Sequence, residues 1–340
     1  MCRRFFYRIL KTLCLLILLS NLCHAQSAKE QIAVEINRLE KLLSSLSLSD
    51  DEKNSYAKSL SEANAALDAG YVYLSLYKLQ PYWIELKTRE YLKTKTNIKT
   101  LEAFEEEWKQ IGLELNKKEK VLKAVSNAKI PAVVLALSEA SQNQVRPYHQ
   151  SGRLYGINTT VENGLYYLGR SPASLDFAIF CRGLKFTDIK RQPKLRSLDR
   201  ELSFLETEVP KAFSKAESDQ NTQFIRTNVT LKIASELNRD AMYAGALYKY
   251  LDATFYFGLI NADVSQIKDL SQLKTESERF RQMLAAGDID HSIGQLYREM
   301  AQRGLSEIST EKPTEEELKR SLVILEKVIP SYFKYMTGEK

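Results

Sequence analysis

The sequence predicts an all-α protein of about a dozen helices, packed as antiparallel helical hairpins in an extended or two-lobed body. Three observations carry this prediction. Glycine and proline supply only 13 and 8 of the 340 residues, about half of their usual share of about 12%, so few tight turns are available. Apolar residues recur at helical spacing, whereas strand-like alternation is not sustained anywhere. Serine or threonine precedes glutamate by three residues at several expected helix starts, which is the capping-box spacing.

The N-terminal half of the chain carries seven of the expected helices. Leucines between Leu39 and Leu46 form an apolar stripe, and Ser49 and Thr159 stand three residues before a glutamate. Pro131 suits a first helical turn. We expect these helices over residues 28–47, 50–68, 71–94, 98–125, 131–146, 159–168 and 172–183.

The C-terminal half repeats the pattern. Leucine or valine returns every three or four residues from Leu195 to Val209, and again from Leu318 to Ile329 behind a capping box that begins at Thr314. Two aspartates precede His291, where negative charge stabilises a helix start. We expect these helices over residues 195–216, 219–239, 241–259, 263–285, 291–308 and 314–336.

Three glycines mark expected turns between antiparallel helices. Gly70, Gly169 and Gly287 each follow an apolar helical segment and each have a serine five residues further on. Glycine can take the left-handed conformation that ends a helix, and a small residue in the next helix permits close packing. The pattern predicts a helical hairpin at each of the three.

Residues 1–25 have the features of a secretory signal peptide. Four basic residues precede the apolar run from Leu13 to Leu19, and Cys23 and Ala25 form a small-x-small cleavage pattern. The apolar run is shorter than the ~20 residues that a spanning helix needs, so we expect no stable membrane span after cleavage. The sequence therefore predicts an exported protein, periplasmic or extracellular. A permanent anchor and lipidation of Cys23 remain alternatives.

Removal of this segment changes the charge and cysteine counts. Of the 49 basic residues, 45 remain against 43 acidic ones, and a net charge of +2 gives no electrostatic reason to expect nucleic acid as a partner. Cys181 is then the only cysteine, so no internal disulfide can form. A polar, proline-broken stretch at residues 185–196 is the expected seam between helical halves 26–184 and 197–340, which could also form one continuous domain.

Reactive groups are scarce in the mature chain. His149, His291 and Cys181 are the only histidine and cysteine residues that remain, too few for the common zinc sites. The common hydrolase, metalloprotease, dinucleotide and phosphate-loop motifs do not occur. We therefore expect no metal and no cofactor, and the sequence favours a protein without catalytic activity over an enzyme.

Two groups of polar residues are candidate sites. Arg146, His149 and Arg153 would share one helix face if the helix continues past Pro147, and could bind an anion there, although a solvated helix end is the simpler reading.

Asp176 and Asp252 lie within strongly apolar helical segments, so we expect each carboxylate to be partly buried and to need a partner or a proton. If the two helices touch, the carboxylates could act as acid and base. A structural ion pair or hydrogen-bond network is the alternative.

Aromatic residues gather in three segments. Tyrosine and tryptophan combine apolar rings with a polar atom, which suits a groove for a peptide, a glycan or another helix, while core packing is the alternative. The candidate groove residues are Tyr73, Tyr77, Trp83, Tyr166, Tyr167 and Tyr248.

These observations favour an exported helical scaffold or binding module that recognises a protein, peptide or glycan through an aromatic-rich groove. The first alternative is a protein that binds a small anion or ligand through Arg146, His149 and Arg153. The second is a hydrolase-like enzyme built on Asp176 and Asp252.

Overall fold

The computed structural model describes residues 27–125, 129–213, 221–262, 270–302, 304–305 and 313–338. Within these ranges the regular elements are helices, apart from one isolated bridge between Arg191 and Ile289, so the all-α prediction is confirmed. The predicted signal peptide, residues 1–25, lies outside the described residues. Parts of four expected helices also lie outside the described residues: 214–216, 219–220, 263–269, 303 and 306–308.

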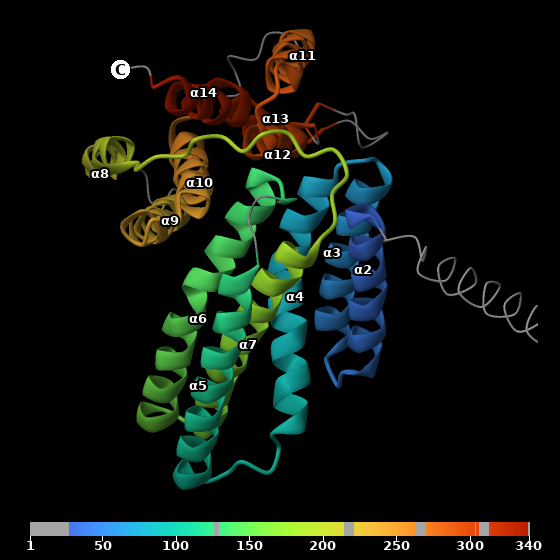
Figure 1. The fold of residues 1–340 in the computed structure, drawn as a ribbon, viewed down its shortest axis with the longest axis vertical. Coiled ribbons are helices and arrows are strands. Elements are labelled where there is room, and N and C mark those ends of the chain that lie inside the picture. The colour runs from blue at the N-terminus through green and yellow to red at the C-terminus, as the bar shows by residue number, and fades with distance from the viewer. Residues whose placement is uncertain are drawn as a thin grey trace, which may run out of the picture.

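The first half of the chain forms a lower lobe of long helices that run side by side (Figure 1). Each of these helices packs against at least one other member of the lobe. They are α2 (Ala28–Ser45), α3 (Asp50–Asp68), α4 (Val72–Thr94), α5 (Leu101–Ala124), α6 (Ala132–Asn158) and α7 (Val161–Gly183).

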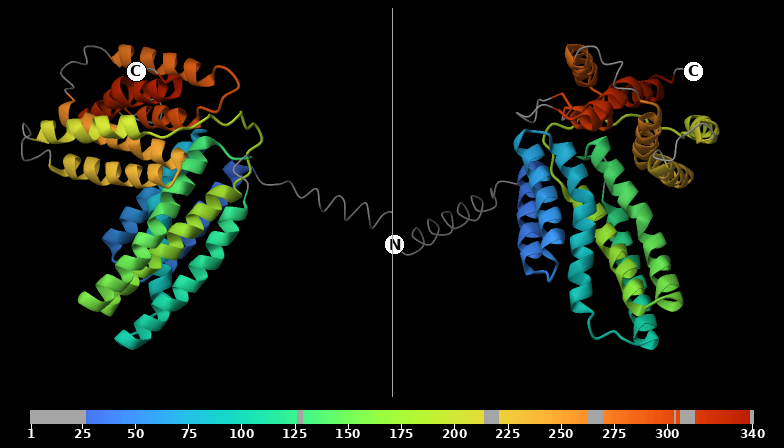
Figure 2. Two further views of the ribbon diagram at one scale, coloured as in Figure 1. Left: turned by 60° about the vertical axis from the view of Figure 1, so that its left-hand side comes forward. Right: turned by 180° about the vertical axis from the view of Figure 1, so that it is seen from behind.

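The second half forms an upper lobe that lies across the top of the lower one (Figure 2). Its last three elements run end to end, with a π-helical turn just before Pro330, whose missing N–H cannot continue the α-helical ladder. The elements are α8 (Asp199–Phe213), α9 (Asn221–Arg239), α10 (Tyr243–Asn261), α11 (Leu270–Ala285), α12 (Ser292–Ala301), α13 (Glu315–Val323), η4 (Ile324–Val328) and α14 (Ile329–Thr337).

One hydrophobic core runs through both lobes. It includes Leu39 and Leu79 from the lower lobe and Leu251, Ile293 and Val328 from the upper lobe. Residues 184–198, which contain no helix, connect the lobes in an extended path over their junction (Figure 1). Separation of the lobes would therefore expose apolar surface on both.

A second core lies at the far end of the lower lobe, between α5, α6 and α7. Phe104 and Leu168 belong to it. Gly156 and Gly164 let the helices approach closely, because a Cβ atom on Gly156 would clash with the Phe104 ring and one on Gly164 with the backbone of Gly156. Small residues thus set the distance between α6 and α7.

Gly70 and Gly287 form the turns that the sequence predicts. Gly70 has φ = 85° between α3 and α4, and Gly287 has φ = 72° between α11 and α12. Both values lie in the left-handed region that glycine adopts without steric cost. Two of the three expected hairpins are therefore confirmed.

The third expected hairpin is wrong. α7 passes through Gly169 and Pro172 without a turn, and α6 continues through Pro147 instead of ending at residue 146. Gly169 makes room for the Tyr91 ring, since a Cβ atom there would lie 2.5 Å from Tyr91 Cδ1. The two helices pack against each other along their length, and this packing outweighs the hydrogen bond that each proline removes.

Helices that start on the surface carry their own caps. In each, a serine or threonine hydroxyl accepts the backbone N–H of the third residue on, which satisfies one of the free donors of the first turn. The capping boxes predicted at Ser49 and Thr314 are confirmed. The one predicted at Thr159 is wrong: the Thr159 hydroxyl donates to Tyr155 O (2.8 Å), and Thr160 caps α7. The capping residues are Ser27, Ser49, Thr100, Thr160 and Thr314.

Helices that start at the junction between the lobes have no side-chain cap of their own. This holds for α4, α6, α10 and α12. A buried carboxylate replaces the cap in each case. Glu299 accepts Leu74 N–H (3.0 Å) at α4, and Glu139 accepts Gly245 N–H (2.7 Å) at α10. Each of these two carboxylates belongs to the lobe opposite the helix that it caps.

Asp290 caps two helices at once. One oxygen accepts the N–H of Ala132 (2.5 Å), the first residue of α6, and the other accepts the N–H of Ser292 (2.8 Å), the first residue of α12, which begins two residues after Asp290. The sequence predicts that an aspartate stabilises the start of α12, but it does not predict the contact of Asp290 with the lower lobe.

Candidate functional site

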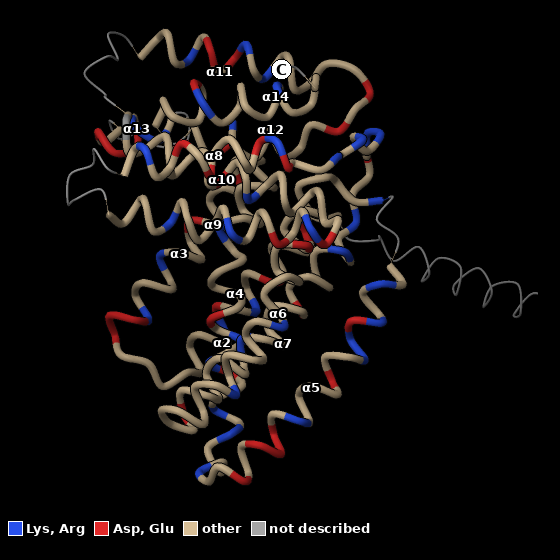
Figure 3. Tube along the Cα trace, turned by 90° about the vertical axis from the view of Figure 1, so that its left-hand side faces the viewer, with Lys and Arg blue, Asp and Glu red and all other residues tan. Residues whose placement is uncertain are grey.

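Two adjoining cavities open where the lobes meet. Their volumes are about 320 Å³ and 460 Å³, and they share the wall residues Glu62, Tyr77, Lys78 and Tyr256. The walls come from both lobes, so neither lobe alone could form the cavities. We call the two cavities together the interlobe groove. Figure 3 shows the molecule from the side, with the upper-lobe helices α9 and α13 drawn above α3.

The smaller cavity is mainly apolar. Leu74, Phe255, Leu259, Met300 and Ile324 lie in its wall. Charged side chains also line it, chiefly on α3, α4, α9 and α13; they are Glu62, Lys78, Arg226, Glu317 and Arg320. We call this part the apolar cavity. It can accept an apolar side chain because binding would remove apolar surface from water on both partners.

The larger cavity is lined by five tyrosines, Tyr77, Tyr82, Tyr148, Tyr248 and Tyr256, and we call it the tyrosine cavity. The Tyr77 and Tyr248 rings meet edge to face, with their centroids 6.4 Å apart. Within the described part of the chain, the hydroxyls of Tyr77, Tyr82 and Tyr256 have no hydrogen-bond partner. These three hydroxyls can therefore bond to a ligand.

Asp252 lies at the base of the tyrosine cavity and is fully engaged. Its Oδ1 accepts the Tyr297 hydroxyl (2.8 Å), and its Oδ2 pairs with Lys249 Nζ (2.9 Å). Burial, reinforced by the Asp252 charge, raises the pKa of Tyr297 well above its usual value, so this phenol remains a hydrogen-bond donor. The carboxylate thus holds α10 against α12, as the structural alternative expected.

Most charges around the groove are paired inside the protein. Lys78 Nζ lies 2.7 Å from Glu62, and Arg320 lies 2.9 Å from Glu316. Arg226, on the exposed side of α9, has no carboxylate within ion-pair distance among the described residues, and its guanidinium lies 5.8 Å from the Tyr256 ring centroid.

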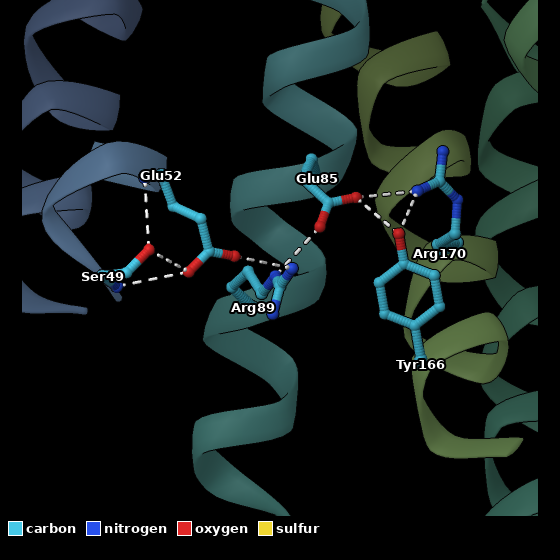
Figure 4. A network of polar contacts seen from close by, with 6 residues as sticks. All are labelled: Ser49, Glu52, Glu85, Arg89, Tyr166 and Arg170. Carbon is cyan, nitrogen blue, oxygen red and sulfur yellow. Dashed lines mark hydrogen bonds and ion pairs between the residues drawn. The ribbon is translucent and has the colours of Figure 1, made fainter. Parts of the chain in front are cut away.

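A polar network holds Arg170 at the wall of the tyrosine cavity (Figure 4). Arg170 and the Tyr166 hydroxyl both donate to Glu85 Oε2 at 2.8 Å. The other Glu85 oxygen pairs with Arg89 (2.9 Å), which reaches Glu52 at the start of α3 (3.5 Å). This network joins α3, α4 and α7 and fixes the guanidinium next to Tyr148.

Arg146, His149 and Arg153 do share one face of α6, as the sequence predicted if the helix continued. That face packs against α5. Arg146 binds Glu119 through two bonds (2.7 and 3.0 Å), and Arg153 pairs with Glu105 (3.2 Å).

His149 is buried against Trp108, with ring centroids 4.8 Å apart and Nε2 3.0 Å from Trp108 O. Burial lowers its pKa below the usual value, so the imidazole is neutral at pH 7. The three side chains thus join α5 to α6, and each already has a partner within the protein.

Asp176 and Asp252 line different cavities and have different partners. Asp176 pairs with Lys118 Nζ (2.6 Å), and its side chain is 43% exposed, so this carboxylate is partly buried and has a charged partner. The apolar neighbours of Asp176 in the sequence pack toward the cores and leave one face of α7 open to solvent. The structure therefore does not bring the two carboxylates together.

The six candidate aromatic residues divide between groove and core. Tyr77 and Tyr248 line the interlobe groove. Trp83 is buried against Phe180, with ring centroids 4.8 Å apart. Tyr73, next to Phe186, borders a separate polar cavity at the seam.

The other two aromatic candidates lie on α7. Tyr166 belongs to the Glu85 network, and Tyr167 stacks on Tyr155 with centroids 4.5 Å apart near the far end of the lower lobe. Neither lines the interlobe groove.

Other groove residues were not singled out as site residues from the sequence. Tyr82 and Tyr256 belong to the aromatic segments, so ring density pointed to their neighbourhood. No pattern in the sequence singles out Tyr148, Arg226 or Arg320 as groove residues. The two arginines line the cavity because α9 and α13 pack at the lobe junction. Residues close to them in the sequence do not predict this packing.

Comparison with protein-family models, with curated proteins and with solved structures finds no match for this chain. Among the described residues, no three histidine, cysteine, aspartate or glutamate side chains gather so that they could hold a metal ion. In the same part of the chain, no helix combines the length and apolar character needed to cross a membrane.

Proposed function

We propose that this protein is a binding module that holds a peptide segment in the interlobe groove. The observation that carries the proposal is the set of three tyrosine hydroxyls, on Tyr77, Tyr82 and Tyr256, that have no partner within the described part of the chain and lie beside the apolar cavity. Tyrosine is favoured in recognition surfaces because its rigid ring buries apolar area while its hydroxyl bonds to polar groups.

The order of surfaces along the groove favours a peptide over a glycan. The apolar cavity offers room for one side chain, and the adjoining tyrosine cavity offers hydroxyls that can bond to backbone carbonyls or amides. A peptide presents both kinds of group within a few residues, whereas a glycan presents hydroxyls at almost every position. The engaged state of Asp252 and Asp176 supports binding without catalysis.

A library of terminally blocked octapeptides tests the proposal. We expect a subset to bind, and fluorescence anisotropy to show that Tyr256→Ala weakens this binding by about tenfold or more, because Tyr256 borders both cavities. Tyr155→Ala is the matched control: this tyrosine is 38% exposed and stacks on Tyr167 outside the groove. Absence of binding, or equal losses in the two variants, would contradict the proposal.

We also propose that the module acts outside the cytoplasm, in the periplasm or the extracellular space. Support comes from the basic, apolar and small-residue order of residues 1–25. Expression of the full chain in a bacterial host, followed by fractionation and intact-mass measurement, should give an exported protein that begins at Gln26. A full-length product retained in the cytoplasm would refute this.

A further inference from the structure

Among the residues that the structure describes, the charges around the apolar cavity leave one cation without an internal counterion. Lys78 and Glu62 neutralise each other, and Arg320 pairs with Glu316. The Glu317 carboxylate accepts the backbone N–H (3.0 Å) and the hydroxyl (3.1 Å) of Thr314 in the capping box of α13. Arg226 is the cation that remains.

Arg226 is well placed to meet a ligand. It lines the apolar cavity from α9, and its guanidinium lies 5.8 Å from the ring centroid of Tyr256, one of the four residues that line both cavities. The Tyr256 hydroxyl is without a hydrogen-bond partner in the described residues, so it can donate to the same ligand group.

The local electrostatics agree with this geometry. Burial, and to a lesser degree Asp252, raises the pKa of Tyr256, while Arg226 and then Arg320 act in the opposite direction. The positive charges of Arg226 and Arg320 therefore stabilise negative charge at the position of the Tyr256 hydroxyl. Since Arg320 already has a carboxylate partner, Arg226 is the guanidinium that can pair with a negative group of a ligand.

We propose that the groove is specific for an acidic peptide motif, in which an apolar side chain fills the apolar cavity and a nearby carboxylate pairs with Arg226 and accepts the Tyr256 hydroxyl. This inference rests on the proposed function and adds the chemistry of the ligand. A planar carboxylate matches the two parallel N–H donors of a guanidinium. Exchange of the guanidinium's hydration for this paired contact gives selectivity more than raw affinity.

Blocked octapeptides with one leucine and, two residues on, glutamate, glutamine or lysine test the motif. At low salt we expect the glutamate peptide to bind about fivefold more tightly than the glutamine peptide, and the lysine peptide to bind least. The glutamate preference should fall as salt is raised from 20 mM to about 500 mM, because screening shortens the reach of the charge.

Arg226→Gln should abolish the preference for glutamate, so that the glutamate and glutamine peptides bind this variant with equal affinity. Arg239→Gln is the matched control, since Arg239 lies on the same helix, is exposed and pairs with Asp240 (3.6 Å). It should keep the preference intact. Circular dichroism spectra and urea midpoints of the two variants should agree, which separates loss of charge from loss of fold.

The possible outcomes separate the inference from the proposed function. Peptides that bind without preference for glutamate, or with a preference that survives Arg226→Gln, overturn the acidic motif and leave peptide binding in place. If sodium decanoate binds in an Arg226-dependent manner while no blocked peptide binds, the occupant is a free amphiphilic carboxylate, and both proposals are wrong. Absence of binding by any of these probes also overturns both.

Discussion

Helix starts on the surface and helix starts at the lobe junction are stabilised in different ways. On the surface, α3 takes its cap from Ser49, the residue immediately before it. At the junction, α4 and α10 take theirs from Glu299 and Glu139, which are 225 and 106 residues away in the chain. A local cap forms as soon as the first turn does. A remote cap requires both lobes to be in place.

This difference shows how the lobes are held in register around the groove. Glu299, Glu139 and Asp290 are at most 8% exposed, so the N–H groups that they accept would be left unsatisfied in a dry environment if a lobe moved. The contacts run in both directions, because Glu139 reaches from the lower lobe and the other two reach from the upper lobe. We infer that the remote caps fix the width of the groove.

The largest expected effect comes from Asp290→Ala. Removal of this carboxylate leaves the first N–H groups of α6 and α12 without their buried acceptor. We expect the free energy of unfolding, measured with urea, to fall by about 4 kcal/mol, at about 2 kcal/mol for each N–H group. Hydrogen exchange should accelerate at the starts of α6 and α12 together.

Two further variants bracket this effect. Asp288→Ala removes an exposed carboxylate that pairs with Arg191 on the surface (3.3 Å), and it should change stability by less than about 0.5 kcal/mol. Asp290→Asn keeps one acceptor and should lose about half as much as the alanine variant. If Asp290→Ala accelerates exchange in α12 alone, the cap does not join the lobes.

A smaller effect per carboxyl is expected from pH. Burial raises the pKa of Glu139 and of Glu299 to about 7, from an ordinary value of 4.5. Both carboxyls therefore bind more protons in the folded than in the unfolded chain between these pH values. Their contribution to stability is full below about pH 4.5 and is lost as pH rises toward 7, by about 3 kcal/mol for each carboxyl.

The double variant Glu139→Gln, Glu299→Gln isolates this contribution. The histidines act in the opposite direction, since burial lowers the pKa of His149 and of His291 and costs stability as pH falls. They are common to both proteins and cancel in the comparison. Urea unfolding at pH 5, 6, 7 and 8 should show the variant gaining on the wild type as pH rises. Parallel curves would refute the proposed protonation of the two carboxyls.

The same contrast explains how much the sequence could predict. Helix existence, the Ser49 cap and the Gly70 turn depend on residues within one or two turns of each other, and these predictions are confirmed. Gly169 carries the same local pattern as Gly70 but lies inside a helix, because the Tyr91 ring packs against it. Local pattern cannot distinguish a glycine needed for a turn from one needed for close packing.

The groove follows the same rule. The segments rich in aromatic residues contain Tyr77 and Tyr248, which line the interlobe groove. They also contain Trp83 and Tyr167, which do not. Arg226 enters the wall only because α9 packs across the junction. Partners that are distant in the chain decide which aromatic and charged residues face a shared cavity.

The smallest expected effect comes from Ser49→Ala. The Ser49 hydroxyl accepts Glu52 N–H (3.3 Å), and Glu52 in turn accepts Ser49 N–H (3.2 Å) (Figure 4). We expect a loss of about 1 kcal/mol, with faster hydrogen exchange confined to the first turn of α3. Ser61→Ala, at an exposed position on the same helix, should be neutral or slightly stabilising. Because the surface cap is independent of the lobe junction, Ser49→Ala and Asp290→Ala should add in the double variant; a shortfall of more than about 0.5 kcal/mol would mean that the two kinds of cap are coupled.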